Sequence, residues 1–281
     1  MRLHEIRARL PADARVFQIL FLALLLGIGV TVRDFSIAPA QILLTFAAGI
    51  GTQRLWVRVL GLERVGVLSA VVTCFGLSML LRADSLWVHP LVAAVAISSK
   101  FVIRVGGKHV YNPANLGLVA ALLLFPGVWV SPGQWGNDLA YAAWFLALGG
   151  VVATRARRID LSVAFLACWL GLVALRIAYL GQGWSILVHQ MQSGALLLFA
   201  FFMISDPMTA PNHPKARLAF VALVAIVAYV WQFVLFRPNA LVWALFLVLP
   251  LVPLLDRLLP AGRFAWTAAR ATPRPSAAGP G

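Results

Sequence analysis

The stretch FFMISDPMTAPNHPKARL (Phe201–Leu218) carries an apolar segment directly into Ser-Asp-Pro, followed by Thr, Asn, His and two further prolines. Asp206 followed by Pro207 is the pattern of a helix start. The carboxylate can accept hydrogen bonds from free backbone N–H groups, and proline fits the first turn. The apolar flanks indicate that this start lies at the end of a membrane span. Two readings stay open for Asp206, a cap only or a cap that also contacts a ligand.

The composition is that of a membrane protein. Of the 281 residues, 62% are hydrophobic and 11% are charged, whereas soluble domains carry about 25% charged residues. The net charge of +14 could indicate a nucleic-acid partner, but the Lys and Arg residues lie in short gaps between apolar runs. A nucleic-acid binder instead gathers them on one polar face. We therefore expect the lipid bilayer as the surroundings and no nucleic acid.

Apolar segments long enough to cross the bilayer, or nearly so, recur along the chain. A spanning helix needs about 20 mostly apolar residues. Ten segments are predicted as spans: 16–32, 38–53, 66–81, 86–103, 113–130, 138–154, 161–180, 184–204, 218–236 and 239–256. The predicted fold is an all-α polytopic membrane domain over residues 16–260. It follows a basic N-terminus (1–15) and precedes a Pro, Gly and Ala-rich tail (261–281), which we expect to be disordered.

The positive charges predict the orientation. With alternating spans and a cytoplasmic N-terminus, 19 of the 23 Lys and Arg residues fall on the cytoplasmic side, as expected for cytoplasmic loops. Both termini are therefore predicted to be cytoplasmic, in a multi-pass protein of the bacterial plasma (inner) membrane. No small-residue cleavage site follows the first span before Arg33, so we expect that span to be retained.

Polar residues inside spans are candidates for function, because unpaired polar groups are costly in lipid. Asn112-Pro113 repeats the cap-then-proline pattern at the start of the fifth span, on the same side as Asp206. Two such helix starts near one another would suit an anion, a phosphate or a polar ring. Plain helix capping is the alternative reading.

A second polar group lies in the outer half of the eighth span. His189, Gln192 and Ser193 are spaced i, i+3 and i+4, so they share a face of one helix. That face would line a transport path or form hydrogen bonds between helices. Cys74 and Cys168 are isolated within apolar spans and are expected to be packing residues. No metal-ligand spacing and no catalytic constellation occurs, so neither site is predicted.

Two segments carry a resemblance to a known family. NPANLGL (112–118) and FFMISDPMTAP (201–211) resemble segments of the RnfD/NqrB family, and the likeness continues to LPLVPLLDRL (249–258). The resemblance covers at least Tyr111 to Leu258. It implies a ten-helix fold of two inverted five-helix halves (16–130 and 138–260). It also implies a subunit of an electron-transport or ion-coupled complex with membrane or redox partner subunits. The candidate cofactor-binding residues are Asn112, Pro113, Asn115, Asp206, Pro207 and Thr209.

The chain departs from the family where flavin is attached. The family binds FMN covalently through the threonine of a Ser-Gly-Ala-Thr motif after the fifth span, but VSPGQWGND (130–138) contains no threonine. The nearest Ser-Gly-Ala, Ser193 to Ala195, continues into leucine. Covalent FMN is therefore not expected, and noncovalent FMN or riboflavin is the remaining flavin hypothesis. In lacking the motif the chain is similar to short homologues associated with enediyne-type gene clusters.

Two other functions compete with the subunit hypothesis. The chain could be a standalone channel or exporter for a small solute or natural product, with His189, Gln192 and Ser193 along the path. It could also be a scaffold whose polar residues only cap and cross-link helices. Electron transport predicts copurifying redox partners, whereas a channel needs none.

Overall fold

The computed structural model describes residues 13–33, 35–62, 65–131 and 139–264. The first half holds α2 (Ala14–Thr31), α3 (Pro39–Val59), α4 (Leu68–Leu80), α5 (Val88–Val102) and α6 (Pro113–Leu124). The second half holds α7 (Leu139–Arg155), α8 (Ile159–Leu180), α9 (Ser185–Met191), α10 (Gly194–Leu198), η2 (Phe199–Met203), α11 (Pro214–Tyr229), η3 (Val230–Val234), α12 (Ala240–Val248), η4 (Leu249–Leu251) and α13 (Val252–Leu258). The short strands are β1 (Leu81–Ala83), β2 (Arg104–Val105), β3 (Lys108–His109) and β4 (Val128–Val130).

The all-α membrane fold is confirmed, because helices occupy each predicted span and strands are few. Within the described residues, four helices are long and apolar enough to cross a membrane, and the bent pair α9 and α10–η2 adds a fifth. The shorter apolar helices α4, α5, α6 and the described part of α7 fall below that length. The number of ten crossings therefore stays a prediction.

The fifth span is only partly helical, because α6 ends at Leu124, which corrects the predicted helix over 113–130. α4 agrees with the predicted third span, 66–81, to within two residues. β1 follows α4, and β4 follows α6 after Pro126 and Gly127. α6 ends before Pro126, and Gly127 adopts a positive φ of 65° in the turn that leads to β4, a conformation that favours glycine. β1 and β4 pair antiparallel, with Leu81 opposite Val130. The pairing satisfies backbone groups of β1, whose residues are buried and which would otherwise lack hydrogen-bond partners.

Arg82 shows why α4 ends where it does. Its guanidinium is fully buried, and Nη1 donates to the carbonyl oxygens of Ser78 (3.0 Å) and Leu81 (2.6 Å). The last carbonyls of a helix lack partners within the helix, and a nearby cation stabilises them. The charge pattern predicts Arg82 in an external loop. The structure instead places it in the core, 5.4 Å from the ring of Phe35.

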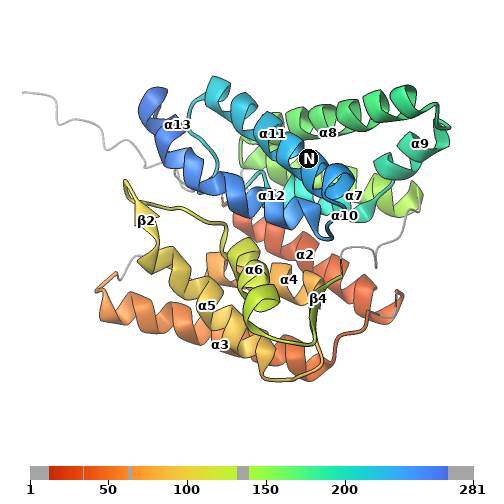
Figure 1. Ribbon diagram of the computed structural model, residues 1–281. Coiled ribbons are helices and arrows are strands. Elements are labelled where there is room, and N and C mark those ends of the chain that lie inside the picture. The colour runs from red at the N-terminus through yellow and green to blue at the C-terminus, as the bar shows by residue number, and fades with distance from the viewer. Residues whose placement is uncertain (1–12, 34, 63–64, 132–138, 265–281) are drawn as a thin grey trace, which may run out of the picture.

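The helix contacts of the first half recur in the second. α2 packs on α4, α3 on α5 and α5 on α6. In the second half α7 packs on α10 and η2, α8 on α11 and α11 on α12. Between the halves, α2 packs on α7 and α6 on α12, so equivalent helices meet. Figure 1 shows α3 to α6 below and α8 to α13 above. The division into two five-helix halves stays a prediction, and "half" is used below for the helices α2–α6 and α7–α13.

The two ends of the helices form two faces. We call the basic face the one that carries the β2–β3 hairpin and the connections 155–158 and 204–217. The opposite face carries β1, β4 and the turn 235–239. In Figure 1, β2 and α13 lie at the left and β4 and α9 at the right. Contacts such as Lys108 with Asp256 join connections of the basic face that lie far apart in sequence.

Two neighbouring glycines in α7 test the packing between α7 and η2. A Cβ at Gly149 would lie 2.6 Å from Cβ of Phe201, whereas a Cβ at Gly150 would meet nothing within 4 Å. We expect Gly149→Ala to destabilise the fold by about 1–3 kcal/mol, because the core must shift to admit the methyl group.

Gly150→Ala is the matched control. It should leave stability unchanged or raise it by about 0.5–1 kcal/mol, since alanine is the better helix former. Unfolding in mixed detergent micelles measures both variants. Equal stabilities for the two would contradict the packing described.

Candidate functional site between the two halves

Asn112 and Asp206 meet at the interface of the two halves. Asn112 is the N-cap of α6: its Oδ1 accepts from the backbone N–H of Asn115 at 3.1 Å. Its Nδ2 donates to Oδ2 of Asp206 at 3.2 Å. The other oxygen of Asp206 accepts from the N–H of Met208 at 3.0 Å. One side chain therefore caps a helix and also joins the first half to the second.

The turn that Asp206 begins is not the start of the next long helix. The N–H groups of Thr209 and Ala210 bond to the carbonyl of Asp206, but the turn does not continue. α11 begins at Pro214, four residues before the predicted span, and its N-cap is His213. Asp206 thus stabilises a compact loop between two membrane segments.

Two of the predicted ligand residues are internal links. Asn115 is fully buried and donates through Nδ2 to the carbonyl of Val242 at 2.9 Å, joining α6 to α12. Thr209 is buried and its Oγ1 lies 3.5 Å from the carbonyl oxygen of Asp206. Neither lines the nearby cavity, whereas Asn112, Pro113, Asp206 and Pro207 do.

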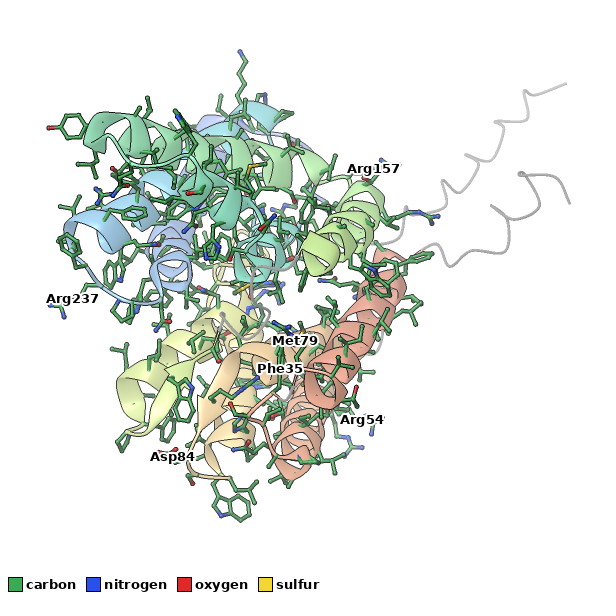
Figure 2. The ribbon with its side chains drawn as sticks, turned by 90° about the vertical axis from the view of Figure 1, so that its right-hand side faces the viewer. Phe35, Arg54, Met79, Asp84, Arg157 and Arg237 are labelled. Carbon is green, nitrogen blue, oxygen red and sulfur yellow. The ribbon has the colours of Figure 1, made fainter. Side chains whose placement is uncertain are left out.

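This inner cavity opens between the halves beside Asn112 and Asp206. It measures about 90 Å³ and is lined by α2, α4, α5, α6, α7 and η2. Met79 lines this cavity and lies between the two halves (Figure 2). Its polar and charged lining includes Arg15, Gln18, Ser69, Thr73, Lys100, His109, Asn112, Ser205 and Asp206. Two cations, Arg15 and Lys100, and the carboxylate of Asp206 therefore line the same space.

Lys100 is a site residue that the sequence pattern does not reveal. It lies in the last turn of α5 and is 9% exposed. Its Nζ donates to Oε1 of Gln53 at 2.8 Å and to Oγ of Ser69 at 2.9 Å. Because Lys100 ends an apolar run, it is counted among the loop cations in the sequence. The polar residues at 53 and 69 are the available signal that a buried partner is needed.

His109 adds a second titratable group, from the hairpin on the basic face. Burial holds the pKa of its imidazole well below the ordinary value, and the positive charges of Lys100, Arg104 and Lys108 act in the same direction. The carboxylate of Asp206 opposes them. His109 is therefore neutral at pH 7 and can donate or accept a hydrogen bond at the cavity wall.

Lys108 donates a hydrogen bond to the loop that contains Asp206. Its Nζ donates to Oδ2 of Asp256 at 3.0 Å and to the carbonyl of Ala210 at 2.8 Å. Oδ1 of Asp256 accepts from the N–H of Asn212 at 2.8 Å. Asp256, the acid at the end of the last span, thus connects the hairpin of the first half to a loop of the second.

The outer polar group is arranged differently from the prediction. α9 ends at Met191, and the chain bends by 45° before the segment that begins at Gly194. The expected helical face of His189, Gln192 and Ser193 is therefore not formed. Ser193 caps α10 and lines a second cavity, of about 440 Å³, on the opposite face. His189 is exposed, and neither it nor Gln192 lines either cavity.

Three side chains belong to both cavities. Leu80, Leu198 and Met203 line the inner cavity and also the larger outer one. All three are buried and apolar. The two spaces are thus separated by an apolar wall at the interface of the halves.

The described residues bear on metal binding, but they include only the start of the segment in which the family attaches flavin. No group of three or more His, Cys, Asp or Glu side chains suited to a metal occurs in the described residues. Cys74 is buried, and its Sγ donates to the carbonyl of Thr45 at 3.4 Å, as fits a packing residue. Of the segment 130–138, residues 132–138 lie outside the described residues.

The Lys108–Asp256 contact can be tested by a double-mutant cycle with Lys108→Met and Asp256→Asn. Both side chains are largely buried, so we expect a coupling energy of about 1 kcal/mol in the free energy of unfolding. Lys215→Met is the control, because that lysine is exposed. Additive effects at 108 and 256 would show that the contact does not hold the loop.

Comparisons with known proteins agree with this architecture. Residues 132–265 match the NQR2, RnfD, RnfE family. One relative, a component of the ion-translocating oxidoreductase complex of Actinobacillus pleuropneumoniae serotype 5b, is 30% identical over 188 residues, covering 64% of this chain and 52% of that protein. The protein of the same name from Haemophilus influenzae PittEE is 33% identical over 128 residues, covering 43% of this chain and 35% of that protein.

The chain thus matches about half, or less, of the length of these relatives. The family match starts at residue 132 and includes Asp206 and Asp256, while Asn112 precedes it. The matched residues and the all-α membrane fold support the resemblance to the RnfD/NqrB family.

Proposed function

We propose that this chain is an RnfD-like integral membrane subunit that works within an electron-transport complex. The observation that carries the proposal is the contact of Asn112 with Asp206. It joins the two segments that resemble the family, at a cavity between the halves. The relatives that the chain matches are named as subunits of an ion-translocating oxidoreductase complex. Membrane partner subunits are accordingly part of the proposal.

The proposed orientation has the basic face in the cytoplasm of a bacterial plasma membrane. The connections on this face carry most of the cations, among them Arg155, Arg157, Lys215 and Arg217. Cytoplasmic loops hold such an excess. The inner cavity would then face the cytoplasm, and the outer cavity the other side.

The inner cavity does not fit a flavin. Asn112, His109 and Asp206 offer donors and acceptors of the kind a flavin ring uses. However, the cavity of about 90 Å³ is well below the 300–1,000 Å³ typical of cofactor sites. We therefore assign no electron-transfer step to this site and propose that partner subunits hold the electron carriers. The inner cavity would take a few waters or a small polar solute.

The first test is purification of the tagged chain from its native membranes in mild detergent. We expect redox subunits to copurify and the complex to show a flavin spectrum. Acid precipitation should leave no flavin on this chain, because the attachment threonine is lacking. The isolated chain should be colourless.

A matched pair of acid variants makes the test specific. Asp206→Leu should weaken the complex, since it removes the link between the halves and leaves Asn112 and the N–H of Met208 without their acceptor. Asp84→Leu, at an exposed acid on the opposite face, should copurify normally. A chain that is recovered alone under every mild condition contradicts the subunit proposal.

A channel for a small solute is the second candidate. It is favoured by the apolar wall of Leu80, Leu198 and Met203, shared by two cavities on opposite sides. A constriction of this kind can close a path by excluding water. In this reading the chain would work without redox partners.

Flux of glycerol into liposomes tests the channel. Met203→Ala should raise the flux severalfold by opening the wall, and Met203→Trp should abolish it. Met191→Trp is the control, because Met191 is exposed and lines neither cavity. Flux no higher than in empty liposomes, for the wild type and for Met203→Ala, would exclude this function.

A further inference from the structure

The outer cavity is large enough to hold a ligand of its own. Its volume of about 440 Å³ lies in the range of small-molecule sites, roughly 300–1,000 Å³. It is lined by α8, the bend between α9 and α10, η2, η3, the turn 235–239 and the start of α12. Nothing in the site at Asn112 and Asp206 uses this space.

The charge on the described lining of the outer cavity is positive only. The polar side chains that line it are Gln190, Ser193, Gln232, Arg237 and Asn239. Arg237 is the only charged residue among the described lining residues, and none of them is acidic. Its guanidinium has no ion pair or hydrogen bond within the described part of the chain. Figure 2 shows Arg237 at the edge of the molecule, as expected for a residue at the mouth of the cavity.

The turn that presents Arg237 is held in a strained shape. Phe236 has a φ of 52°, in a region that is costly for a bulky side chain, whereas Asn239, with a φ of 59°, is a residue that tolerates this region. The N–H of Arg237 donates to the carbonyl of Trp231 at 3.0 Å, and Trp231 Nε1 donates to the carbonyl of Pro238 at 3.0 Å. These bonds fix both ends of the turn and hold Arg237 and Asn239 at the cavity. Such strain is often found at ligand clamps.

The rest of the wall is apolar. Trp169 and Phe199 contribute aromatic rings, and Leu80, Val130 and Leu196 contribute aliphatic side chains. Leu80 and Val130 come from the first half, so the cavity deepens toward the interface of the halves. A ligand that fills this space would bury apolar surface, with a gain of roughly 25 cal/mol per Å².

We propose that the outer cavity binds a single-chain apolar anion, with its carboxylate at Arg237 and its hydrocarbon chain against Trp169, Phe199 and Leu80. The guanidinium pairs with a carboxylate through charge-assisted hydrogen bonds. Asn239 and Gln232 can donate further hydrogen bonds to it. The absence of acids from the described lining removes the repulsion that would exclude an anion. An uncharged chain of the same length would lack this anchor.

The test is a titration of the delipidated full chain with palmitate and with methyl palmitate, followed by native mass spectrometry. We expect one palmitate per chain, bound at least about tenfold more tightly than the ester. Arg237→Gln should remove this preference, and Arg237→Lys should retain most of it. Arg33→Gln is the control, because Arg33 lies outside the cavity lining. Ala195→Trp should block both ligands by filling the cavity.

Phosphatidylglycerol, which has two chains and a phosphodiester, tests whether the site is specific for a single-chain acid. Competition by this lipid that depends on Arg237 would contradict the single-chain ligand, and a lack of competition would support a free acid. Equal binding of palmitate by the Arg237→Gln and Arg33→Gln variants would overturn the proposal. Equal affinity for acid and ester would do the same, as would unsaturable binding that Ala195→Trp leaves intact.

Discussion

The structure depends on satisfying polar groups where two apolar halves meet. Asn112 caps α6 and donates to Asp206, while Lys108 donates to Asp256 and to the carbonyl of Ala210. Helix ends and loops at a membrane surface leave backbone groups without partners, and lipid cannot supply them. The chain supplies them from the other half. The loop 204–213 therefore finds part of its hydrogen-bond partners in the other half.

This constraint also sets where space remains. The side chains that link the halves at the basic face hold the inner cavity open beside Lys100 and His109. Farther along the interface, Leu80, Leu198 and Met203 close it, and beyond them the bend of the eighth span opens the outer cavity. The charges differ at the two ends. The inner cavity is lined by two cations and by the carboxylate of Asp206, whereas Arg237 is the one charged residue in the described lining of the outer cavity. The two spaces would therefore select different ligands.

Pairings between distant segments could not be read from local sequence. The motifs predict Asn115 and Thr209 beside the ligand, yet both hydrogen-bond within the interior. Arg82 and Lys100 count as loop charges in the sequence because each stands next to an apolar run. Both are buried, since carbonyls of α4 and the side chains of Gln53 and Ser69 satisfy them. The helical face expected at His189 does not form because the chain bends before Gly194.

The sequence by itself determined the all-α membrane fold, the positions of the helical segments and the two helix-start patterns at Asn112 and Asp206. These follow from local quantities: apolar length, charge between spans, and the capping chemistry of single residues. Only the tertiary structure decided that the two patterns meet, that Lys108 and Asp256 join the halves, and where the cavities lie. Such contacts join residues 94 and 148 positions apart, and they form only when helix packing brings distant polar groups within hydrogen-bond reach.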